Sequence, residues 1–481
     1  MNKYKKLMKN TVIIAIGNFG SKFLVFFMMP IFTRFLTTSE LGTANLLFQI
    51  PALLFPIITL SVNESVFRFI FDKGSDRRQI LSIGLYITLI GNLIFAIITP
   101  ILIFAGIDFF TENAVLLVLF SLTASIRFLI AHYCRARGLF KLFAIQGIFN
   151  TITTMSFNLL FIVALGLGAY GYVVGVLLGD LLTVIFIVLA NRSWRFILPP
   201  SKVNKKVGKK MLRYSLPLTP TFFCWSILIS SNLIFIRIFV GEDMTGLYTA
   251  ANKIPTLLTI ASGVFMQAWS FSAVSTQSPK ERNRFFTKVY DYYQAIIFVA
   301  ASGIIIFARV FATILFGPAF HEAWRFIPLL AMATVFFCLA NFKVSVYMVQ
   351  KNSKSPFFTV LYGAIVHVIL SFVLIPESLL GISMVGLGGY GAAIAAIIGF
   401  GIVYITRAID ISKKVRYNQR IDKIFLSTLV IGAQVALSYF APRWQVLGHI
   451  SAILIMLAIN ATSLIEAGLY LHGKMKKKKK I

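Results

Sequence analysis

Three polar side chains interrupt long apolar stretches, where ionisable groups are rare. Lys22 lies well inside the first such stretch, and Asn18 precedes it by four residues, so both share one helix face. Lys253 lies inside a later stretch. Because a charge at membrane depth is costly unless it faces a polar cavity, we expect both lysines to face a cleft and to bind an anionic ligand. The alternative is that each lysine pairs with a neighbouring acid and only holds helices together.

Four further ionisable residues are candidates for binding or coupling. Arg127 is a third candidate ligand for an anion, because a guanidinium can bind two oxygens at once. Glu64 and Arg68 are four residues apart and can form an ion pair within one helix; alternatively, Glu64 takes up H+ or Na+ and releases Arg68 to the substrate. Asp180, in the middle of another stretch, is a second candidate for ion coupling, unless it only hydrogen-bonds a neighbouring helix.

The elements that must position these residues are membrane-spanning helices. Of the 481 residues, 58% are hydrophobic and only 13% are charged, and the mean hydropathy is +0.84. Apolar stretches of the length that crosses a bilayer follow one another almost end to end, which predicts an all-α integral membrane protein with about fourteen spans. The expected spans are residues 11–35, 42–70, 80–105, 113–136, 143–165, 169–190, 214–240, 246–272, 285–308, 324–350, 356–376, 387–408, 423–441 and 446–471.

The charges predict the orientation of these spans. Alternate loops and the two ends hold 36 of the 46 Lys and Arg residues, whereas the loops between them hold 7 of the 16 acids and few cations. Basic loops stay on the cytoplasmic side, so we expect a cytoplasmic-membrane protein with both termini in the cytoplasm. The net charge of +30 then reflects topology and contact with anionic membrane lipids, and no nucleic-acid partner is needed to explain it. The first apolar stretch reads as a span and not as a cleavable signal peptide.

An internal repeat organises the chain. The segment GLGAYGYVVGVLLG at 166–179 returns as GLGGYGAAIAAIIG at 386–399, and Gly42 precedes an Ile-Pro pair at the same spacing as Gly246. Six spans therefore look duplicated in the same orientation, as two six-helix lobes around a central cleft. We expect lobes at 1–190 and 214–408, a basic cytoplasmic linker at 191–213, and two extra spans with a basic tail at 409–481.

The first 70 residues also resemble a known family. The features that carry the resemblance are Asn18, Gly20-Ser21-Lys22, Pro30, Thr33-Arg34, Glu40-Leu41-Gly42, Pro51, Pro56 and Glu64-Ser-Val-Phe-Arg68-Phe69. This pattern is similar to the start of bacterial polysaccharide flippases, in the multidrug, oligosaccharidyl-lipid and polysaccharide exporter superfamily. The resemblance implies that undecaprenyl-pyrophosphate-linked oligosaccharide repeat units are moved across the cytoplasmic membrane by alternating access. It implies as partners the lipid-linked oligosaccharide, a polysaccharide polymerase and export machinery.

Three other functions are weaker alternatives. A lipid II flippase shares the span count and the cationic cleft, and a multidrug or cation antiporter of the same superfamily would have twelve spans and an acidic cleft. A membrane enzyme using the same donors would need a sizeable outer loop with catalytic residues, and no paired-carboxylate site or nucleotide loop is recognisable. We therefore expect no enzymatic activity and no cofactor. The three cysteines, Cys134, Cys224 and Cys338, are scattered in apolar context and predict neither disulfides nor a metal site.

Overall fold

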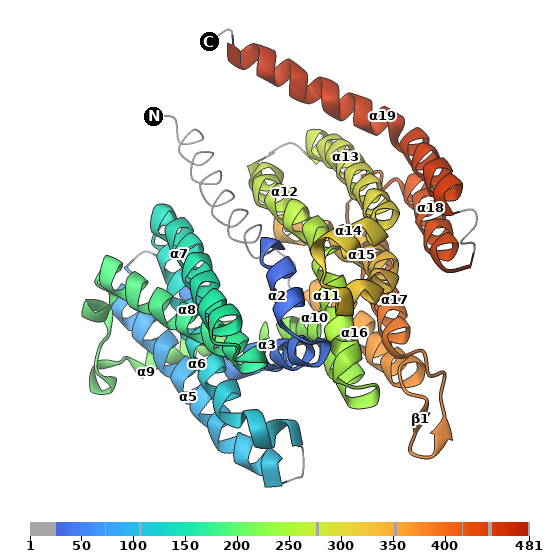
Figure 1. Cartoon of the computed structure of the whole chain (residues 1–481). Helices are drawn as coiled ribbons and strands as arrows, with labels where there is room; N and C mark the ends of the chain where they lie inside the picture. The colour runs from blue at the N-terminus through green and yellow to red at the C-terminus, as the bar shows by residue number, and fades with distance from the viewer. Residues whose placement is uncertain are drawn as a thin grey trace. The chain divides into compact units, whose positions relative to one another are not determined.

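The computed structural model describes residues 26–72, 74–104, 108–275, 279–350, 354–415, 417–440 and 445–479. The chain divides into two compact units, residues 1–249 and 250–481. Helices account for almost all of the structure, which confirms the predicted all-α fold (Figure 1).

The first unit contains the helices up to α11, whose last residues belong to the second unit. They are α2 (Met29–Phe35), α3 (Thr38–Ile58), α4 (Val62–Phe69), α5 (Arg77–Phe104), α6 (Asp108–Ala136), α7 (Phe140–Asn158), the π-helix η1 (Leu159–Ala164), α8 (Gly168–Asn191), η2 (Ser193–Phe196), η3 (Pro200–Lys202), α9 (Lys205–Ser215), α10 (Thr219–Phe239) and α11 (Glu242–Lys253).

The second unit contains the remaining helices and one short hairpin. They are α12 (Thr256–Ser275), α13 (Pro279–Ile306), α14 (Ala308–Leu315), η4 (Pro318–Phe326), α15 (Ile327–Gln350), α16 (Lys354–Leu374), the antiparallel strands β1 (Ser378–Leu379) and β2 (Ile382–Ser383), α17 (Gly388–Ser412), α18 (Ile421–Phe440) and α19 (Gln445–Lys479).

Twelve helical segments in the described part of the chain are long and apolar enough to cross a membrane. Most of the expected first span lies outside the described residues, so the total of about fourteen stays a prediction. The expected span 42–70 ends at Ile58, because Leu60 and Ser61 have left-handed backbone angles that separate α3 from α4. The expected span 246–272 is likewise interrupted after Lys253, at the turn that contains Pro255.

The repeated glycine segments have the same local structure in both units. Gly166 and Gly168 have φ of +63° and +55°, and Gly386 and Gly388 have φ of +69° and +52°. Side chains with a Cβ are strained in this left-handed region, so glycine at these positions permits the turn that starts α8 and α17. The sequence repeat therefore corresponds to a repeated turn-to-helix unit.

The start of α3 is fixed by a reciprocal cap between Thr37 and Glu40. Thr37 precedes the helix, and its hydroxyl oxygen accepts a hydrogen bond from the backbone N–H of Glu40 at 3.2 Å. The Glu40 carboxylate in turn accepts from the backbone N–H of Thr37 at 2.8 Å. This reciprocal capping satisfies two N–H groups that would otherwise lack helical partners. The Thr-x-x-Glu spacing thus fixes where the span begins.

Candidate functional site

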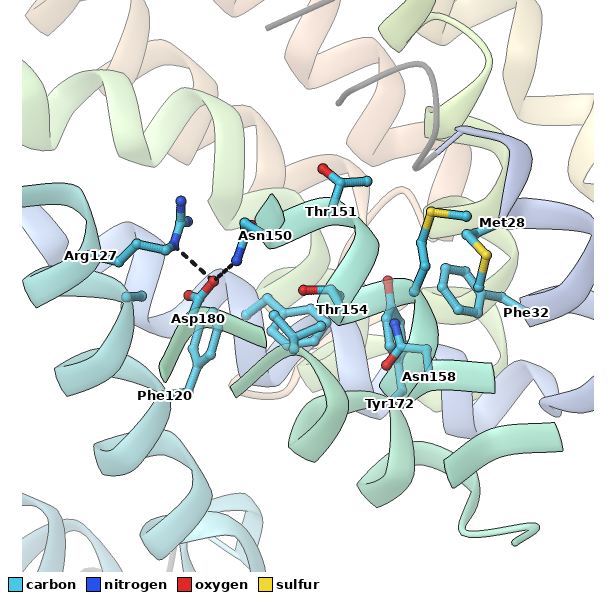
Figure 2. Close-up of a pocket in the computed structure, with 14 residues that line it drawn as sticks. Met28, Phe32, Phe120, Arg127, Asn150, Thr151, Thr154, Asn158, Tyr172 and Asp180 are labelled. Carbon is cyan, nitrogen blue, oxygen red and sulfur yellow. Dashed lines mark hydrogen bonds and ion pairs between the residues drawn. The ribbon is translucent and has the colours of Figure 1, made fainter. Parts of the chain in front are cut away.

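The first unit holds a buried ion pair between two residues that the sequence analysis named separately. Arg127 on α6 and Asp180 on α8 approach to 2.8 Å, measured from Nε to Oδ1 (Figure 2). The amide nitrogen of Asn150 on α7 donates to the same Oδ1 at 2.8 Å. The Asp180 side chain is only 4% exposed, whereas that of Arg127 is 28% exposed. Three spans thus meet at one carboxylate.

These three side chains border a cavity of about 260 Å³. Figure 2 shows that the polar residues line it together with aromatic and sulfur-containing side chains. Its other lining residues are Met28, Phe32, Phe48, Phe120, Ala124, Thr151, Thr154, Met155, Asn158, Tyr172 and Val176. The volume is below the range of about 300–1,000 Å³ that is usual for drug-sized ligands. The cavity therefore suits an ion with a few waters better than a sugar chain.

Polar side chains on α7 were missed by the sequence analysis. Asn150, Thr154 and Asn158 follow one another at four-residue spacing, so they form one stripe on α7 and all three line the cavity. This regular polar stripe within an apolar span is the signal that would have identified them. They carry no charge, so nothing in their residue types alone marks them as unusual within a membrane span.

Glycines on α8 allow this polar stripe to approach. A Cβ at Gly175 would lie 2.1 Å from the Asn158 side-chain oxygen, and a Cβ at Gly179 would lie 2.2 Å from the Thr154 hydroxyl oxygen. Real Cβ atoms do not come so close, so only glycine permits this packing of α7 against α8. The glycines of the repeated segment therefore set the position of the polar wall opposite Asp180.

The Asp180 carboxylate binds both of its polar partners through the same oxygen atom. Arg127 and Asn150 both contact Oδ1, and neither of these two contacts uses Oδ2. Neutralising Asp180 would weaken the ion pair and leave the partly exposed Arg127 able to bind another anion. Arg127 also lines a second cavity of about 270 Å³, with Pro51, Phe55 and Ser121 among its walls. The geometry thus offers an exchange of partners at Arg127.

The Glu64–Arg68 ion pair that the sequence suggested is not formed. Arg68 instead pairs with Asp72 at 2.5 Å, on the exposed side of α4. Glu64 points to a more buried environment, where it accepts a hydrogen bond from the Asn63 amide at 3.2 Å. Burial raises the pKa of the Glu64 carboxyl, and the charge of Arg135 on α6 opposes this rise. The helix α4 has eight residues and is not one of the twelve candidate spans.

The other predicted ligands are placed differently. Lys22 and Asn18 lie outside the described residues. Lys253 is the last residue of α11 and is partly exposed. No ion pair of Lys253 with an acid is found in the described part of the chain. Its role as an anion ligand therefore stays a prediction.

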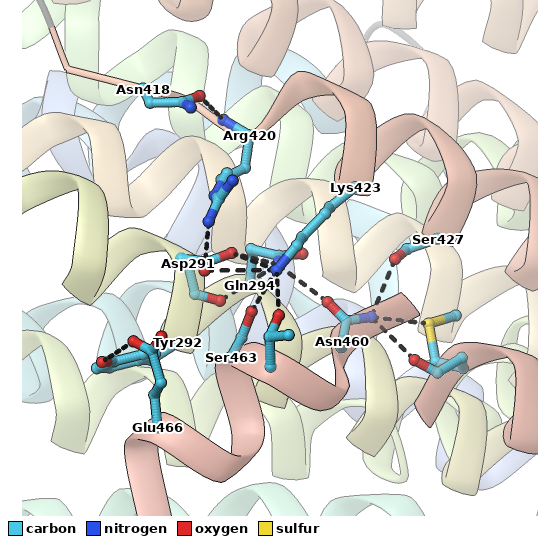
Figure 3. Close-up of polar contacts among 12 residues, drawn as sticks. Asp291, Tyr292, Gln294, Asn418, Arg420, Lys423, Ser427, Asn460, Ser463 and Glu466 are labelled. Atoms are coloured by element: carbon cyan, nitrogen blue, oxygen red, sulfur yellow. Dashed lines mark hydrogen bonds and ion pairs between the residues drawn. The ribbon is translucent and has the colours of Figure 1, made fainter. Parts of the chain in front are cut away.

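The second unit contains its own charged cluster, which the sequence analysis did not identify. Asp291 on α13 lies 3.3 Å from both the Arg420 guanidinium and the Lys423 ammonium group (Figure 3). Lys423 also donates to the Ser463 hydroxyl at 2.6 Å, which connects α18 to α19. The amide of Asn460 on α19 completes the network by accepting from Gln294 and donating to Ser427. These contacts join α18 and α19 to α13.

The described residues contain no group of three or more His, Cys, Asp or Glu side chains arranged for a metal ion. All three cysteines are buried and unpaired with one another. Cys134 accepts a long contact of 3.7 Å from the Asn191 amide, which is typical of a packing residue.

Residues 7–272, more than half of the chain, match the family model described as polysaccharide biosynthesis protein. No curated protein matches the chain significantly. The matched region includes the whole Arg127–Asp180 site.

Solved structures show a similar fold. The lipid II flippase MurJ in an inward closed conformation aligns over 94% of this chain and 100% of its own, with a TM-score of 0.69 and 16% identity. An outward-facing MATE multidrug transporter of the MOP superfamily aligns over 85% of this chain and 95% of its own, with a TM-score of 0.54 and 15% identity. A MATE structure in the straight conformation aligns over 85% of this chain and 96% of its own, with a TM-score of 0.58 and 15% identity. At these identities the likeness concerns the fold.

Proposed function

This chain belongs to the polysaccharide biosynthesis protein family, and on that premise we propose that it flips undecaprenyl-pyrophosphate-linked oligosaccharide repeat units across the cytoplasmic membrane. It would do so by alternating access of a cationic cleft, with the polyprenyl tail remaining in lipid. The pyrophosphate-sugar head would supply the negative charge that such a cleft attracts. The product would feed the synthesis of a cell-surface polysaccharide, with a polymerase and export machinery as partners.

The observation that supports this proposal most directly is the Arg127–Asp180 pair beside a cavity. An arginine that exchanges a buried carboxylate for a phosphate can couple ion binding to substrate binding. In this scheme H+ or Na+ neutralises Asp180, and Arg127 then contributes to binding the substrate anion. Because Asp180 is buried, its ionised form would be strongly disfavoured without a partner, so Arg127 can leave it only when a proton or Na+ is bound.

The remaining site residues have proposed roles in the same cycle. Lys22 and Lys253 would neutralise the pyrophosphate or acidic sugars, Asn18 would hydrogen-bond the head group, and Arg68 would bind anions near the membrane surface. Glu64 is a second candidate for coupling to an ion gradient. We also propose that both termini face the cytoplasm, as the distribution of basic loops predicts.

Lipid II flipping is the second candidate function. It is favoured by the extent of the structural likeness to MurJ, which covers the whole of that chain. The two substrates share the undecaprenyl-pyrophosphate anchor and differ in the attached sugars, so the Arg127–Asp180 site would act in the same way for both. Cation export is less compatible, because Asp180 is the one acid among the lining residues of this cavity and a cationic substrate would lie beside the positive charge of Arg127.

The test is a flipping assay in proteoliposomes. Purified protein is reconstituted with a lipid-linked repeat unit, with lipid II, or with a fluorescent organic cation, and the fraction reaching the opposite leaflet is measured. We expect the lipid-linked repeat unit to move, to be recovered chemically unchanged, and to move much more slowly with Asp180→Asn. Arg325→Met, which removes an exposed ion pair with Glu322, is the matched control and should flip normally.

Each outcome separates the candidates. Movement of lipid II alone would replace the proposed substrate with the second candidate. Export of the cation alone would contradict a lipid-linked substrate, and a cleaved or transferred sugar would indicate an enzyme.

A further inference from the structure

A second and larger cavity lies in the first unit and shares no lining residue with the Arg127–Asp180 cavity. It is a groove of about 730 Å³ between α5 and the short helix α9. Figure 1 shows α9 as a short helix beside the longer α5. The groove has an apolar floor, to which α5 contributes Ile83, Tyr86 and Ile87. None of the roles proposed above uses it.

The groove lies near one end of a membrane span. The span α5 has 28 residues and so extends about 42 Å, which exceeds the hydrocarbon thickness of about 30 Å. Its first residues therefore lie among lipid head groups. Ile83 and Ile87 follow the start of α5 by six and ten residues, or about 9 and 15 Å. If about 6 Å of the helix lies outside the hydrocarbon at each end, these residues lie in the outer part of the acyl-chain layer, just below the head groups.

Two rows of residues on α9 face this groove. Lys205, Lys209 and Arg213 recur at four-residue spacing, so they form one stripe, and all three are exposed and line the groove. Gly208 and Leu212 form the adjacent stripe, and they line the groove as well. A row of cations therefore runs beside an apolar surface over about 12 Å of helix.

Hydrogen bonds hold α9 and the segment before it in place. The Ser65 hydroxyl donates to the Met211 carbonyl at 2.7 Å, which fixes α9 to α4. The Gln79 side chain donates to the Lys202 carbonyl at 2.9 Å and accepts from the Asn204 N–H at 2.8 Å. The groove is thus formed before any ligand arrives, which lowers the entropic cost of binding.

We propose that this groove binds an anionic phospholipid, with the phosphodiester at the cation row and an acyl chain along the apolar floor. Charge complementarity identifies this occupant. The negative charge of an anionic lipid would offset part of the positive charge of Lys205, Lys209 and Arg213, whereas a zwitterionic or neutral lipid would offset none of it. This groove shares no lining residue with the Arg127–Asp180 cavity, beside which we propose that the transported substrate binds. The site is therefore distinct from the proposed transport path.

Native mass spectrometry of the full-length protein in detergent tests the proposal. Phosphatidylglycerol and phosphatidylcholine are added at equal concentrations, and the bound lipid is identified by mass. We expect retained phosphatidylglycerol, and a decrease of about tenfold or more in the triple variant Lys205→Ala, Lys209→Ala, Arg213→Ala. The matched control removes the same charge from residues that do not line the groove, through Lys202→Ala, Lys206→Ala and Lys210→Ala.

A second variant blocks the groove without changing its charge. The nearest atom to a Cβ at Gly208 is Ile83 Cγ2 at 3.8 Å, so a larger side chain fits there without a backbone clash. Gly208→Leu should fill the floor and reduce phosphatidylglycerol binding while the protein keeps its thermal stability. A normal level of bound phosphatidylglycerol in a folded Gly208→Leu protein would overturn the proposal.

Three further results would contradict this assignment. Equal losses in the groove triple variant and its control would mean that the lipid binds through net charge alone. Equal binding of glycerophosphoglycerol, which lacks acyl chains, would indicate a site for free phosphate esters. Displacement of phosphatidylglycerol by an equimolar amount of undecaprenyl pyrophosphate would assign the groove to the transported lipid.

Discussion

The helix pairs α7–α8 and α16–α17 share most of a glycine framework, and one of the differences between them concerns charge. Gly179 is followed by Asp180 in the first unit, and Gly399 is followed by Phe400 at the equivalent place, 220 residues later. Asp180 meets Arg127 on α6 as an ion pair, whereas Phe400 packs edge-on against Phe337 on α15, with ring centroids 5.4 Å apart. At this position the contact between two spans is thus charged in one unit and aromatic in the other.

This difference indicates that packing at this one position does not require a charge, although the second unit buries Arg407 of α17 elsewhere, bonded to Thr359 on α16 and to the Ala340 carbonyl on α15. An apolar contact is sufficient to pack the crossing in the second unit, and a buried ion pair is seldom more stabilising than apolar packing. Burying the carboxylate in the first unit therefore costs free energy that packing at this position does not require. Its position beside a cavity supplies a functional reason for its presence. The comparison between the two units therefore supports a functional role for Asp180 and Arg127 more strongly than the presence of two charges in a span would by itself.

The largest effect is expected from breaking the ion pair on one side. Arg127→Met leaves Asp180 buried without its cation, which should destabilise the protein by about 3 kcal/mol and abolish flipping. Thermal unfolding in detergent and the proteoliposome assay measure these two quantities.

A double variant separates packing from function. Arg127→Met with Asp180→Leu imitates the apolar contact of the second unit, so most of the stability should return while flipping stays absent. If the double variant flipped lipid at the normal rate, the ion pair would be only a structural contact and the comparison would lose its functional meaning.

Adding a methyl group to the glycine framework tests what the two units share. Gly391→Ala should destabilise the protein by about 1–3 kcal/mol, because its Cβ would lie 2.4 Å from the Leu374 carbonyl oxygen. Gly179→Ala should lower the free energy of unfolding somewhat less. Its Cβ would lie 2.2 Å from the Thr154 hydroxyl oxygen, which can rotate away, and the remaining close contact is with the Thr154 Cα at 3.0 Å. Thermal unfolding measures both.

A glycine with free space provides the control for this test. Nothing lies within 4 Å of a Cβ at Gly401 on α17, so Gly401→Ala should change the free energy of unfolding by less than about 1 kcal/mol, or increase it. Only Gly179→Ala should also reduce flipping, because it displaces the polar stripe opposite Asp180. Equal losses of flipping from Gly179→Ala and Gly391→Ala would erase the proposed difference between the units.

A third test uses the charged cluster of the second unit. Asp291 contacts two cations that are 34% and 13% exposed, so solvent can stabilise them when the acid is removed. We expect Asp291→Asn to cost about 1–2 kcal/mol of stability by weakening the attachment of α18 and α19, with flipping retained. Abolished flipping at unchanged thermal stability would show that the second unit also has a functional carboxylate.

The sequence was informative where a residue type has one main structural use. The fourteen-residue glycine repeat predicted a duplicated turn and helix, and the long apolar stretches predicted spans. The break at Leu60 and Ser61 was not predictable, because neither residue favours left-handed angles and tertiary packing imposes them. The pairing of Arg127 with Asp180 across 53 positions was also not predictable, since it depends on which faces of α6 and α8 meet.

The smallest expected effect concerns Glu64, the other candidate acid of the first unit. Residue 268, which is 204 positions later as Gly246 is from Gly42, is an alanine, so this acid again has no equivalent in the second copy. Burial raises the pKa of folded Glu64 above its ordinary value of 4.5, which means that its ionised form opposes folding at neutral pH. Glu64→Gln should therefore raise the melting temperature slightly at neutral pH, and this gain should shrink as the pH falls towards 4.5.

The gain in melting temperature should be unchanged in an Arg68→Gln background, because Arg68 pairs with Asp72. It should be larger in an Arg135→Gln background, because the charge of Arg135 partly offsets the cost of burying ionised Glu64. A gain that depended on Arg68 instead would restore the ion pair suggested by the sequence and remove Glu64 from the set of acids peculiar to the first unit.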